Sequence, residues 1–446
     1  MKAVEEYVEA LGLDAYVVGG AVRDELLGVD SKDADFLVPG VDMETLRARL
    51  APHGRVEDLV VAGRPVGLRL HPRDRAVRAL VPAGIELAPP RRERSTGPGR
   101  HDFEIVVDPD AGVEVDLARR DFTVNAMARR LADGRVVDPY GGRDDLRRRR
   151  LRTVSPRSFA EDPLRLVRGL RFVSQLGFDP DAETVRQMRE EAPSVALVSG
   201  ERIGGGLAAD GMGELSKLLL GREPRRALRL ARDTGVLVAL LPEFEAAIGL
   251  VDEHVFAVVQ AAADAGTPLR VRLAALLHDL GKPAEPGALE HAAAGAALAA
   301  GALRRLRYPN HLRERVVKIV RHHPFRVEAL GGPVEARRLL ARHGDGLVLD
   351  LLDHWEADLR GRDPGPQTRE QLERLAAFRR VVEGELVSPH RLADLAVDGT
   401  DLIELGFRPG PELGRTLAEL LDAVVDEPAL NRRETLRARA EERLRG

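Results

Sequence analysis

The spacing of apolar residues divides the chain into two parts of different character. From Phe159 almost to the C-terminus, apolar residues recur at the intervals of an amphipathic helix. Before about residue 150, short apolar runs such as "AYVVGG" and "ADFLV" alternate with glycine and proline punctuation. Only 4% of the 446 residues are aromatic, so leucine, valine and alanine must fill the cores. The sequence therefore predicts an α+β head followed by a long all-helical body.

Composition excludes several classes of protein. Hydrophobic residues make up 44% and charged residues 31%, which is typical of globular domains, and the length predicts about two to four of them. The absence of cysteine excludes disulfides, thiolate metal sites and a cysteine nucleophile, and suits a reducing cytoplasm. We find no signal peptide and no apolar run of membrane-spanning length. Since the net charge is −4, a nucleic-acid surface must be a local patch.

Within the head, strand and helix signals alternate. "METLRARLAPHG" predicts a helix that ends at Gly54, and "FEIVVDP" predicts a strand. "RRDFTVNAMARRLADGRVVDPYGG", residues 119–142, predicts a helix followed by a hairpin-like turn.

A glycine pair follows the first apolar run. Gly19 and Gly20 let the backbone turn sharply and expose amide groups, and a helix is expected to begin near Ala21. Arg23 would lie in its first turn, where a planar guanidinium can hold a phosphate. The pattern is compatible with a phosphate-binding turn, and also with a plain strand-to-helix connection.

Two aspartates in "KDADFLV" favour the phosphate interpretation. On a strand, Asp33 and Asp35 point to the same face, and two carboxylates there repel each other unless a cation lies between them. Magnesium prefers oxygen ligands and keeps substrate phosphates in its shell. The alternative is a solvated edge strand, but Phe36, Leu37 and Val38 are predicted to be buried. The pattern suits two-metal nucleotidyl transfer, with Glu86 as the candidate third acid.

The head resembles the class II CCA-adding enzymes and bacterial poly(A) polymerases, which are nucleotidyltransferases of the polymerase-β-like superfamily. "GGAVRDELLG…KDADFLV" is similar to their first motif and "RRDFTVNAMA" to their second. "DPYGGRDDLRRRRLRTV" is similar to the third motif and "EDPLRLVRGLRF" to the fourth. The resemblance implies that Asp33 and Asp35 are catalytic and bind Mg²⁺, and that Arg120 and Asp121 belong to the nucleotide site.

The fourth motif also carries a pattern of its own. If it is one helix, Asp162 and Arg165 are three residues apart and can meet. An acceptor and a donor side by side can imitate a pairing edge, although a surface helix with ordinary ion pairs is the simpler interpretation. The resemblance implies that Asp162 and Arg165 select C and then A without a nucleic-acid template. It also implies that Glu161 orients Arg165, and that the nucleotide is bound by Arg168 and Arg171.

One stretch departs from the family pattern. "SGERIGGGLAADGMGELSKLL" separates Glu201-Arg202 from Glu214 by a glycine-rich insertion, where the family has a glutamate four residues after "ER". Three successive glycines are poor helix formers. The insertion is predicted to be either a hinge or a loop.

Histidines gather in the helical body around "LLHDLGKP". Adjacent His278 and Asp279 can bind a divalent metal through imidazole and carboxylate. The segment resembles the HD phosphohydrolase superfamily, which implies the metal ligands His254, His278, Asp279 and Asp358. By the same resemblance His291 and His322 would be outer ligands. Asp350 and Asp353 share the predicted helix of Asp358 and remain alternatives, and a degenerate scaffold domain is the simpler interpretation.

These resemblances together give the predicted organisation. We expect a mixed-sheet nucleotidyltransferase head at 1–152, a base-recognition neck at 153–235, an HD body at 236–362 and a helical tail at 363–446. The tail resembles the tRNA-binding helices of bacterial CCA enzymes, although its composition shows only amphipathic helices.

The expected function is template-independent addition of CCA to tRNA from CTP and ATP, with Mg²⁺ at the head. A Ni²⁺, Mn²⁺ or Mg²⁺ ion at the HD body could support phosphohydrolase activity. The alternatives are a poly(A) polymerase, an enzyme that adds only part of CCA, a metal-dependent phosphohydrolase with an RNA-binding head, and a non-catalytic tRNA-binding scaffold. The expected partners are tRNA, CTP and ATP, with no membrane, for either a monomer or a homodimer.

Overall fold

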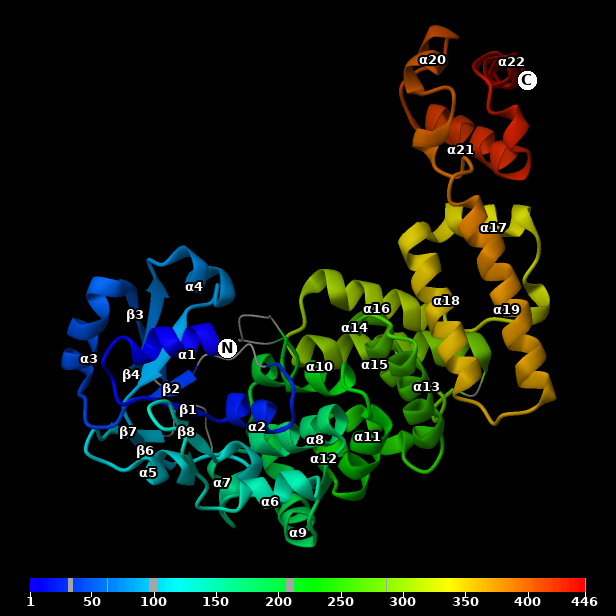
Figure 1. The fold of residues 1–446 in the computed structure, drawn as a ribbon. Coiled ribbons are helices and arrows are strands. Elements are labelled where there is room, and N and C mark those ends of the chain that lie inside the picture. The colour runs from blue at the N-terminus through cyan, green and yellow to red at the C-terminus, as the bar shows by residue number, and fades with distance from the viewer. Residues whose placement is uncertain (31–34, 62, 96–102, 206–211, 286, 446) are drawn as a thin grey trace. The chain divides into compact units, whose positions relative to one another are not determined.

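The computed structural model divides into two compact units, which are described separately (Figure 1). The first comprises residues 1–248 and 302–309, and the second comprises residues 249–301 and 310–446. The structure describes residues 1–30, 35–61, 63–95, 103–205, 212–285 and 287–445.

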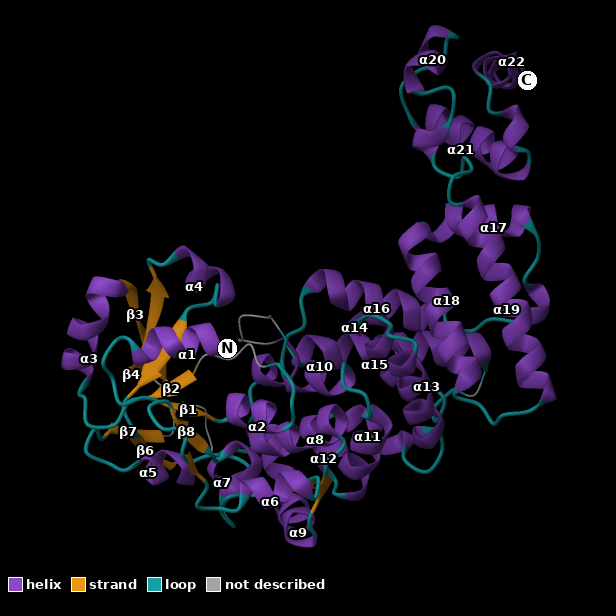
Figure 2. Ribbon diagram, in the orientation of Figure 1, coloured by secondary structure: helices purple, strands orange, loops and turns teal. Residues whose placement is uncertain are grey.

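The head of the first unit is built on a mixed seven-stranded sheet, drawn in orange in Figure 2. The strand order is β3-β4-β5-β2-β1-β8-β9, and β2 pairs with β5 in parallel while the other pairs are antiparallel. Its strands are β1 (Tyr16–Val18), β2 (Asp35–Leu37), β3 (Gly54–Val61), β4 (Arg64–Pro72), β5 (Ile85–Ala88), β8 (Ala128–Arg130) and β9 (Val136–Val137). Two smaller pairs are β6 (Arg91–Ser95) with β7 (Phe103–Val107), and β10 (Arg150–Leu151) with β11 (Asp179–Pro180).

The central strands form because their apolar side chains enter the core. Phe36, Leu37 and Val38 are at most 3% exposed, as the sequence predicted. The helix predicted after residue 119 is wrong. A single helical turn over Thr123–Asn125 leads into β8, which pairs with β1. The β-branched Thr123 and Val124 have modest helix propensity, and pairing with the sheet outweighs it.

Helices make up the rest of the first unit, some within the head and others after it in the chain. In the head these are α1 (Lys2–Glu9), α2 (Gly20–Leu26), α3 (Met43–Leu50), α4 (Arg75–Leu80), α5 (Val113–Ala118) and α6 (Gly142–Arg147). The following helices are α7 (Ser158–Glu161), α8 (Leu164–Leu176), α9 (Ala182–Glu191), α10 (Glu214–Leu219), α11 (Pro224–Asp233) and α12 (Val236–Leu240). Helix α8 packs against α10 and α11, and its buried stripe includes Leu166, Val167 and Leu170.

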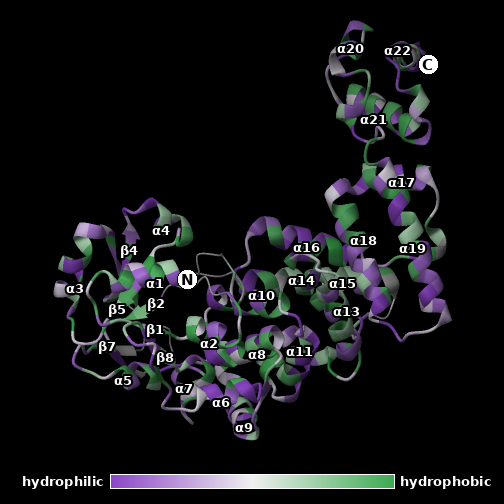
Figure 3. Ribbon diagram, viewed as in Figure 1, coloured by the Kyte–Doolittle hydropathy of each residue, from purple (hydrophilic) through white to green (hydrophobic). Residues whose placement is uncertain are grey.

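The second unit is helical throughout the part that the structure describes. Its helices are α13 (Asp252–Asp264), α14 (Leu269–Leu277), α16 (Asn310–His322), α17 (Pro333–His343), α18 (Asp345–Arg360), α19 (Pro366–Glu385), α20 (Gly399–Glu404), α21 (Pro411–Asp426) and α22 (Arg433–Arg445), and α15 (Ala288–Arg305) contributes to both units. Figure 3 shows apolar and polar residues alternating along these helices, as a helical period requires. Helices α13, α14 and α18 pack on one another, and most histidines of this unit come from them and from α15 and α16, or follow these helices directly.

Among the described helices, none is both long enough and apolar enough to cross a membrane.

Candidate active sites

A row of charged side chains crosses the head sheet. The strand register places Asp35 beside Glu86, Glu86 beside Arg69, and Arg69 beside Glu57, so all four lie on one face. Asp35 is exposed on this face, and Glu86 forms an ion pair with Arg69. Asp33 lies outside the described residues. The register therefore supports Glu86 as a neighbour of Asp35, and its role as a ligand stays a prediction.

Gly19 fits tightly at the start of α2. Its φ of 72° favours glycine, and a Cβ there would lie 2.3 Å from Nη1 of Arg120. Arg120 itself donates to Asp116 over 3.2 Å. Arg23, one turn into α2, donates from Nη1 to Oδ1 of Asn125 over 2.7 Å. The glycine turn thus packs against Arg120 of the second motif, and Arg23 reaches Asn125 of the same motif.

Asp121 is the buried centre of a polar network. Its carboxylate accepts two hydrogen bonds from Arg168, at 2.9 Å and 2.7 Å, one from Asn125 at 3.1 Å and one from the amide of Phe122 at 2.8 Å. Burial alone would raise the pKa of Asp121, but the charge of Arg168 and these hydrogen bonds hold it well below its usual range. Asp121 therefore stays ionised and fixes Arg168.

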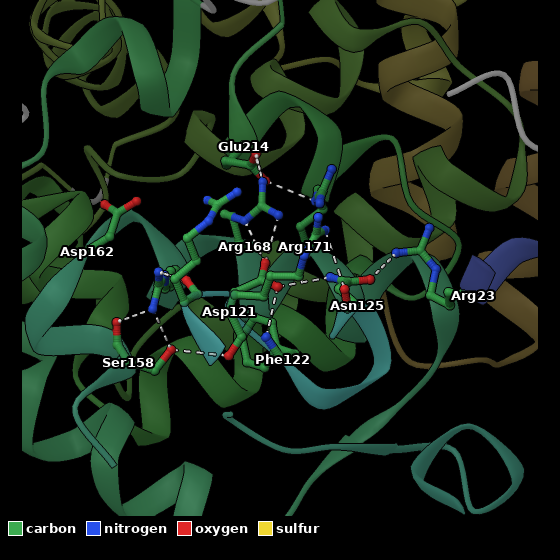
Figure 4. A network of polar contacts seen from close by, with 12 residues as sticks. Arg23, Asp121, Phe122, Asn125, Ser158, Asp162, Arg168, Arg171 and Glu214 are labelled. Carbon is green, nitrogen blue, oxygen red and sulfur yellow. Dashed lines mark hydrogen bonds and ion pairs between the residues drawn. The ribbon is translucent and has the colours of Figure 1, made fainter. Parts of the chain in front are cut away.

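Glu214 holds the other side of the same arginines (Figure 4). It lies 3.5 Å from Nη1 of Arg168 and 2.9 Å from Nε of Arg171. Arg171 also lies over the ring of Phe172, 4.4 Å from its centroid. Burial lowers the pKa of Arg171 to about 10, against the opposing charge of Glu214, so the guanidinium remains charged at neutral pH. We call Asp121, Arg168, Arg171 and Glu214 the arginine network.

The predicted pairing of Asp162 with Arg165 is wrong. Asp162 ends α7 in an extended conformation, because a residue before proline is disfavoured in the helical region. Its carboxylate accepts two hydrogen bonds from Arg202, at 3.2 Å and 2.9 Å. Arg165 instead donates to Ser158 at 3.1 Å, to the Arg119 carbonyl at 2.5 Å and to Glu161 at 3.4 Å. The expected contact between Glu161 and Arg165 is thus present.

A cavity of about 700 Å³ gathers most of the residues that the sequence singled out. It is lined by Gly20, Arg23, Asp35, Arg120, Asp121, Asp162, Arg165, Arg168 and Arg171, together with Arg202 and Phe172. Of the predicted residues of this site that the structure describes, Gly19, Glu86 and Glu161 do not line the cavity. One carboxylate-bearing strand thus faces a wall of guanidinium groups, an arrangement suited to a polyphosphate with a bound cation.

The glycine-rich insertion is closed at its base. The amide of Gly213 donates to the carbonyl of Gly204 over 3.0 Å, and a Cβ on Gly213 would lie 2.3 Å from the Ile203 carbonyl oxygen. Glu214 follows at once and begins α10. The predicted hinge or loop falls on residues 206–211, which lie outside the described residues, so the choice between them stays a prediction.

In the second unit, histidines converge on Asp279. Nε2 of His278 lies 3.2 Å from Asp279 Oδ2, whereas Nε2 of His291 and of His323 lie 3.7 Å and 3.6 Å from Oδ1. His254 lies 3.0 Å from Asp358 and 3.8 Å from Asp279. Two groups have ligand atoms within 4.8 Å of one another: His254, His278 and Asp358, and Asp279, His291 and His323. We call these six residues the histidine–aspartate cluster.

The cluster histidines are oriented for metal binding. Nδ1 of His278, His291 and His323 lies 2.9 Å, 2.8 Å and 2.6 Å from a backbone carbonyl oxygen, so that Nε2 faces the centre. Among the described residues, Nε2 of His278 and Oδ1 of Asp279 are buried without a hydrogen-bond partner. Such a donor set fits a divalent metal. These residues are therefore candidate metal ligands.

The prediction that His322 is an outer metal ligand is wrong. Its ring packs against His343, with centroids 4.6 Å apart, while its neighbour His323 points into the cluster. Adjacent residues near a helix end point about 100° apart, so only one of the two can face the centre.

The other acids of α18 have partners elsewhere. Asp350 accepts from Arg270 and Arg315, and Asp353 accepts from Arg379. This leaves Asp358 at the cluster, beside Arg362. Burial would raise the pKa of Asp358, but hydrogen bonding to His254 and the charges of His278 and Arg362 hold it below its usual range. The alternatives to Asp358 therefore do not join this cluster.

Models of known families match most of the chain in order. The "Poly A polymerase head domain" matches residues 15–152, and the "Probable RNA and SrmB-binding site of polymerase A" matches 177–248. The "HD domain" matches 251–371, and "tRNA nucleotidyltransferase domain 2 putative" matches 385–440.

Individual relatives match over most of the chain. The "Multifunctional CCA protein" of Ralstonia nicotianae is 38% identical over 79% of this chain and 82% of its own length. The protein of that name from Methylococcus capsulatus is 35% identical over 93% and 94%. The Bacillus stearothermophilus CCA-adding enzyme, solved with CTP, is 27% identical, with a TM-score of 0.64 over 99% of this chain and 96% of its own.

A nucleotidyltransferase head on a mixed sheet, followed by helices with an HD cluster, defines a class of RNA-modifying enzyme. The chain belongs to the family of class II CCA-adding enzymes and poly(A) polymerases, in its form with an HD domain.

Several residues of both sites were missed from the sequence. Asp116 is 1% exposed and pairs with both Arg119 and Arg120, at spacings of three and four residues that the sequence displays. His323 was missed because its neighbour His322 was named in its place. Arg202 carries no local signal for its contact with Asp162, because 40 residues separate them.

Proposed function

We propose that the protein adds C, C and A to the 3′ end of tRNA, without a nucleic-acid template. The terminal hydroxyl of the RNA attacks the α-phosphate of CTP or ATP, and pyrophosphate leaves. The observation that carries this function is the cavity in which Asp35 faces the arginine network, in a chain of this family.

The head fits a magnesium site through its oxygen ligands. Asp35 is exposed at the cavity, and Glu86 lies beside Asp35 on the neighbouring strand. Asp33 would be the second aspartate ligand. When bound, magnesium would neutralise the triphosphate and activate the attacking hydroxyl. Arg23, Arg168 and Arg171 bind the phosphates of the nucleotide, and their fixed partners keep them aimed at the cavity.

The base is selected by Asp162 and Arg165. Asp162 accepts from the base edge and Arg165 donates to it, while Arg202 holds the carboxylate of Asp162 in one orientation through two hydrogen bonds. Glu161 and Ser158 hold Arg165 in place. Residues 1–152 serve as the transferase head, 153–235 as the neck and 363–446 as the tRNA-binding tail.

The test is incorporation of nucleotides into tRNA that lacks its CCA end. With magnesium, CTP and ATP, the wild type should complete CCA, and ATP alone should not yield a long A tail. Asp35→Ala should abolish addition. Asp58→Ala is the matched control, because Asp58 is also a carboxylate of the head and pairs with Arg47 away from the cavity. A long A tail would instead indicate a poly(A) polymerase, and addition by Asp35→Ala would reject the metal assignment.

A second activity, hydrolysis of a phosphate ester, is favoured by the histidine–aspartate cluster. Histidines lie near both carboxylate oxygens of Asp279, and this donor set would hold a divalent ion. Lys282 and Arg362 line the same cavity of about 350 Å³ and supply positive charge for a phosphate. The body at 236–362 would thus act as a phosphohydrolase with Ni²⁺, Mn²⁺ or Mg²⁺.

This activity is tested with 2′,3′-cyclic nucleotides and each metal in turn. His323→Ala should abolish hydrolysis and spare CCA addition, whereas His322→Ala, one residue earlier, should spare both. Equal loss in the two variants would contradict the assignment of His323 as a ligand.

A further inference from the structure

The tip of the β3–β4 hairpin carries two exposed apolar side chains into the charged cavity of the first unit. Val60 is 57% exposed and Val61 is 40% exposed. Both line the cavity that also contains Asp35 and Arg168, and the buried Ile105 lies on its wall too. Exposed valine side chains inside an arginine-rich cavity favour an apolar partner, because the removal of apolar surface from water lowers the free energy.

Both valines line the cavity although they are consecutive residues of β3. In a regular strand, successive side chains point to opposite faces, so only one of the two would line a cavity on one side. Both nevertheless line the cavity at the hairpin tip, just beyond a shift in the β3–β4 register between Leu59 and Val60. Arg64, opposite Val61, donates from Nη1 to the Ile105 carbonyl over 3.3 Å and ties the hairpin to β7.

The cavity therefore has two chemically different walls. Guanidinium groups of α8 suit phosphates and the edges of bases, whereas the valines offer no hydrogen-bond donor or acceptor and suit only the face of a base. A nucleotide has both kinds of surface. We propose that the valine wall, formed by Val60 and Val61, holds the face of the last base at the 3′ end of the RNA.

The reaction itself favours the RNA end over the incoming nucleotide as the occupant. This inference rests on the proposed function, in which the last base of the RNA changes at every step. A site for that base must accept whichever base is last, which an apolar contact with the ring face does. The incoming base has to be distinguished, and the polar Asp162 and Arg165 on the other wall serve that purpose.

A binding experiment tests the valine wall without requiring catalysis. Dissociation constants are measured for two tRNA molecules that lack CCA, one with a normal last nucleotide and one whose last nucleotide has no base. For the wild type, removal of the base should weaken binding about tenfold. In the double variant Val60→Ser/Val61→Ser, the two RNAs should bind equally. Leu80→Ser is the control, since Leu80 is also 57% exposed in the head but does not line the cavity.

Two outcomes would overturn the inference. The first is a double variant that keeps the full difference between the two RNAs. The second is a double variant that binds CTP, measured without RNA, more weakly by the same factor, because the wall would then hold the incoming base. Failure of the wild type to extend tRNA would reject the proposed function instead, and the comparison of the two RNAs would still decide on the valine wall.

Discussion

The two candidate sites stabilise buried charge in opposite ways. In the arginine network every charge has an opposite charge beside it, as Asp121 and Glu214 flank Arg168 and Arg171. In the histidine–aspartate cluster the outward nitrogens are tied to backbone carbonyls, while inward atoms of His278 and Asp279 lack hydrogen-bond partners among the described residues. The charges of the first site are paired within the protein, whereas the donor set of the second fits a divalent ion.

The difference predicts which changes each site tolerates. A network of mutual partners is damaged when one partner is removed, because a charge is then left buried. A ligand cluster gains its stability when its ion binds. The experiments below test this contrast from the largest expected effect to the smallest.

Asp121→Ala should have the largest effect on stability. It removes the buried partner of Arg168, whose side chain is 32% exposed, and leaves Arg168 with Glu214 alone. The cost in the free energy of unfolding should lie between about 1 kcal/mol for an exposed pair and about 3–5 kcal/mol for a buried one. Urea unfolding measures the loss. Asp144→Ala is the control, because its pair with Arg147 is exposed. A loss below about 1 kcal/mol would mean that the network does not act as a unit.

Metal should stabilise the second unit through the histidine–aspartate cluster. At a concentration of Mn²⁺ that is 100 times the dissociation constant, the free energy of unfolding should rise by about 2.7 kcal/mol. The rise is measured as an increase in the melting temperature. Asp279→Asn should abolish the rise, and chelator should reverse it. His322→Asn should leave it unchanged. An equal rise in Asp279→Asn would show that the ion binds elsewhere.

Acid should weaken the two regions in different pH ranges. Burial, together with the charges of His278 and His323, keeps the pKa of His354 well below its usual value. The unfolded chain takes up this proton near pH 6.5 while the folded chain resists it, so stability falls progressively as the pH drops below that value. The metal-free protein with His354→Leu should lack this loss.

Asp121 should lose its contribution to stability at a lower pH than His354. Its pKa is depressed by Arg168 and by hydrogen bonds, against the effect of burial, so its contribution is lost only as pH falls below about 4. Unfolding measured from pH 7 to pH 3 separates the loss of stability due to His354 from the loss due to Asp121. A His354→Leu variant with the wild-type profile above pH 5 would contradict the assignment.

Arg202→Ala should have the smallest effect on stability. The pair of Arg202 with Asp162 is partly exposed, so its loss costs about 1 kcal/mol or less. Its effect should appear in the choice between CTP and ATP, which we expect to relax by about tenfold. Arg186→Ala, in an exposed pair of α9, is the control. Unchanged selectivity would mean that Asp162 needs no partner to orient it.

Local patterns in the sequence predicted much of the fold and many members of the sites. The buried run after Asp35, the glycine turn at Gly19 and the helix that ends in His278-Asp279 are all present. Prediction failed where a distant partner decides a local choice. The strand over Ala128–Arg130 forms because β1 pairs with it, and its own residues had suggested a helix.

The sequence by itself determined which side chains exist at which spacing, because apolar periodicity, glycine turns and paired acids are local properties. Only the tertiary structure decided how they pair. Arg202 takes Asp162, Glu214 takes Arg171, and His323 rather than His322 faces Asp279. The physical reason is that an ion pair or a ligand set depends on distances of a few ångström, and chain segments far apart in sequence reach those distances only after the core has packed.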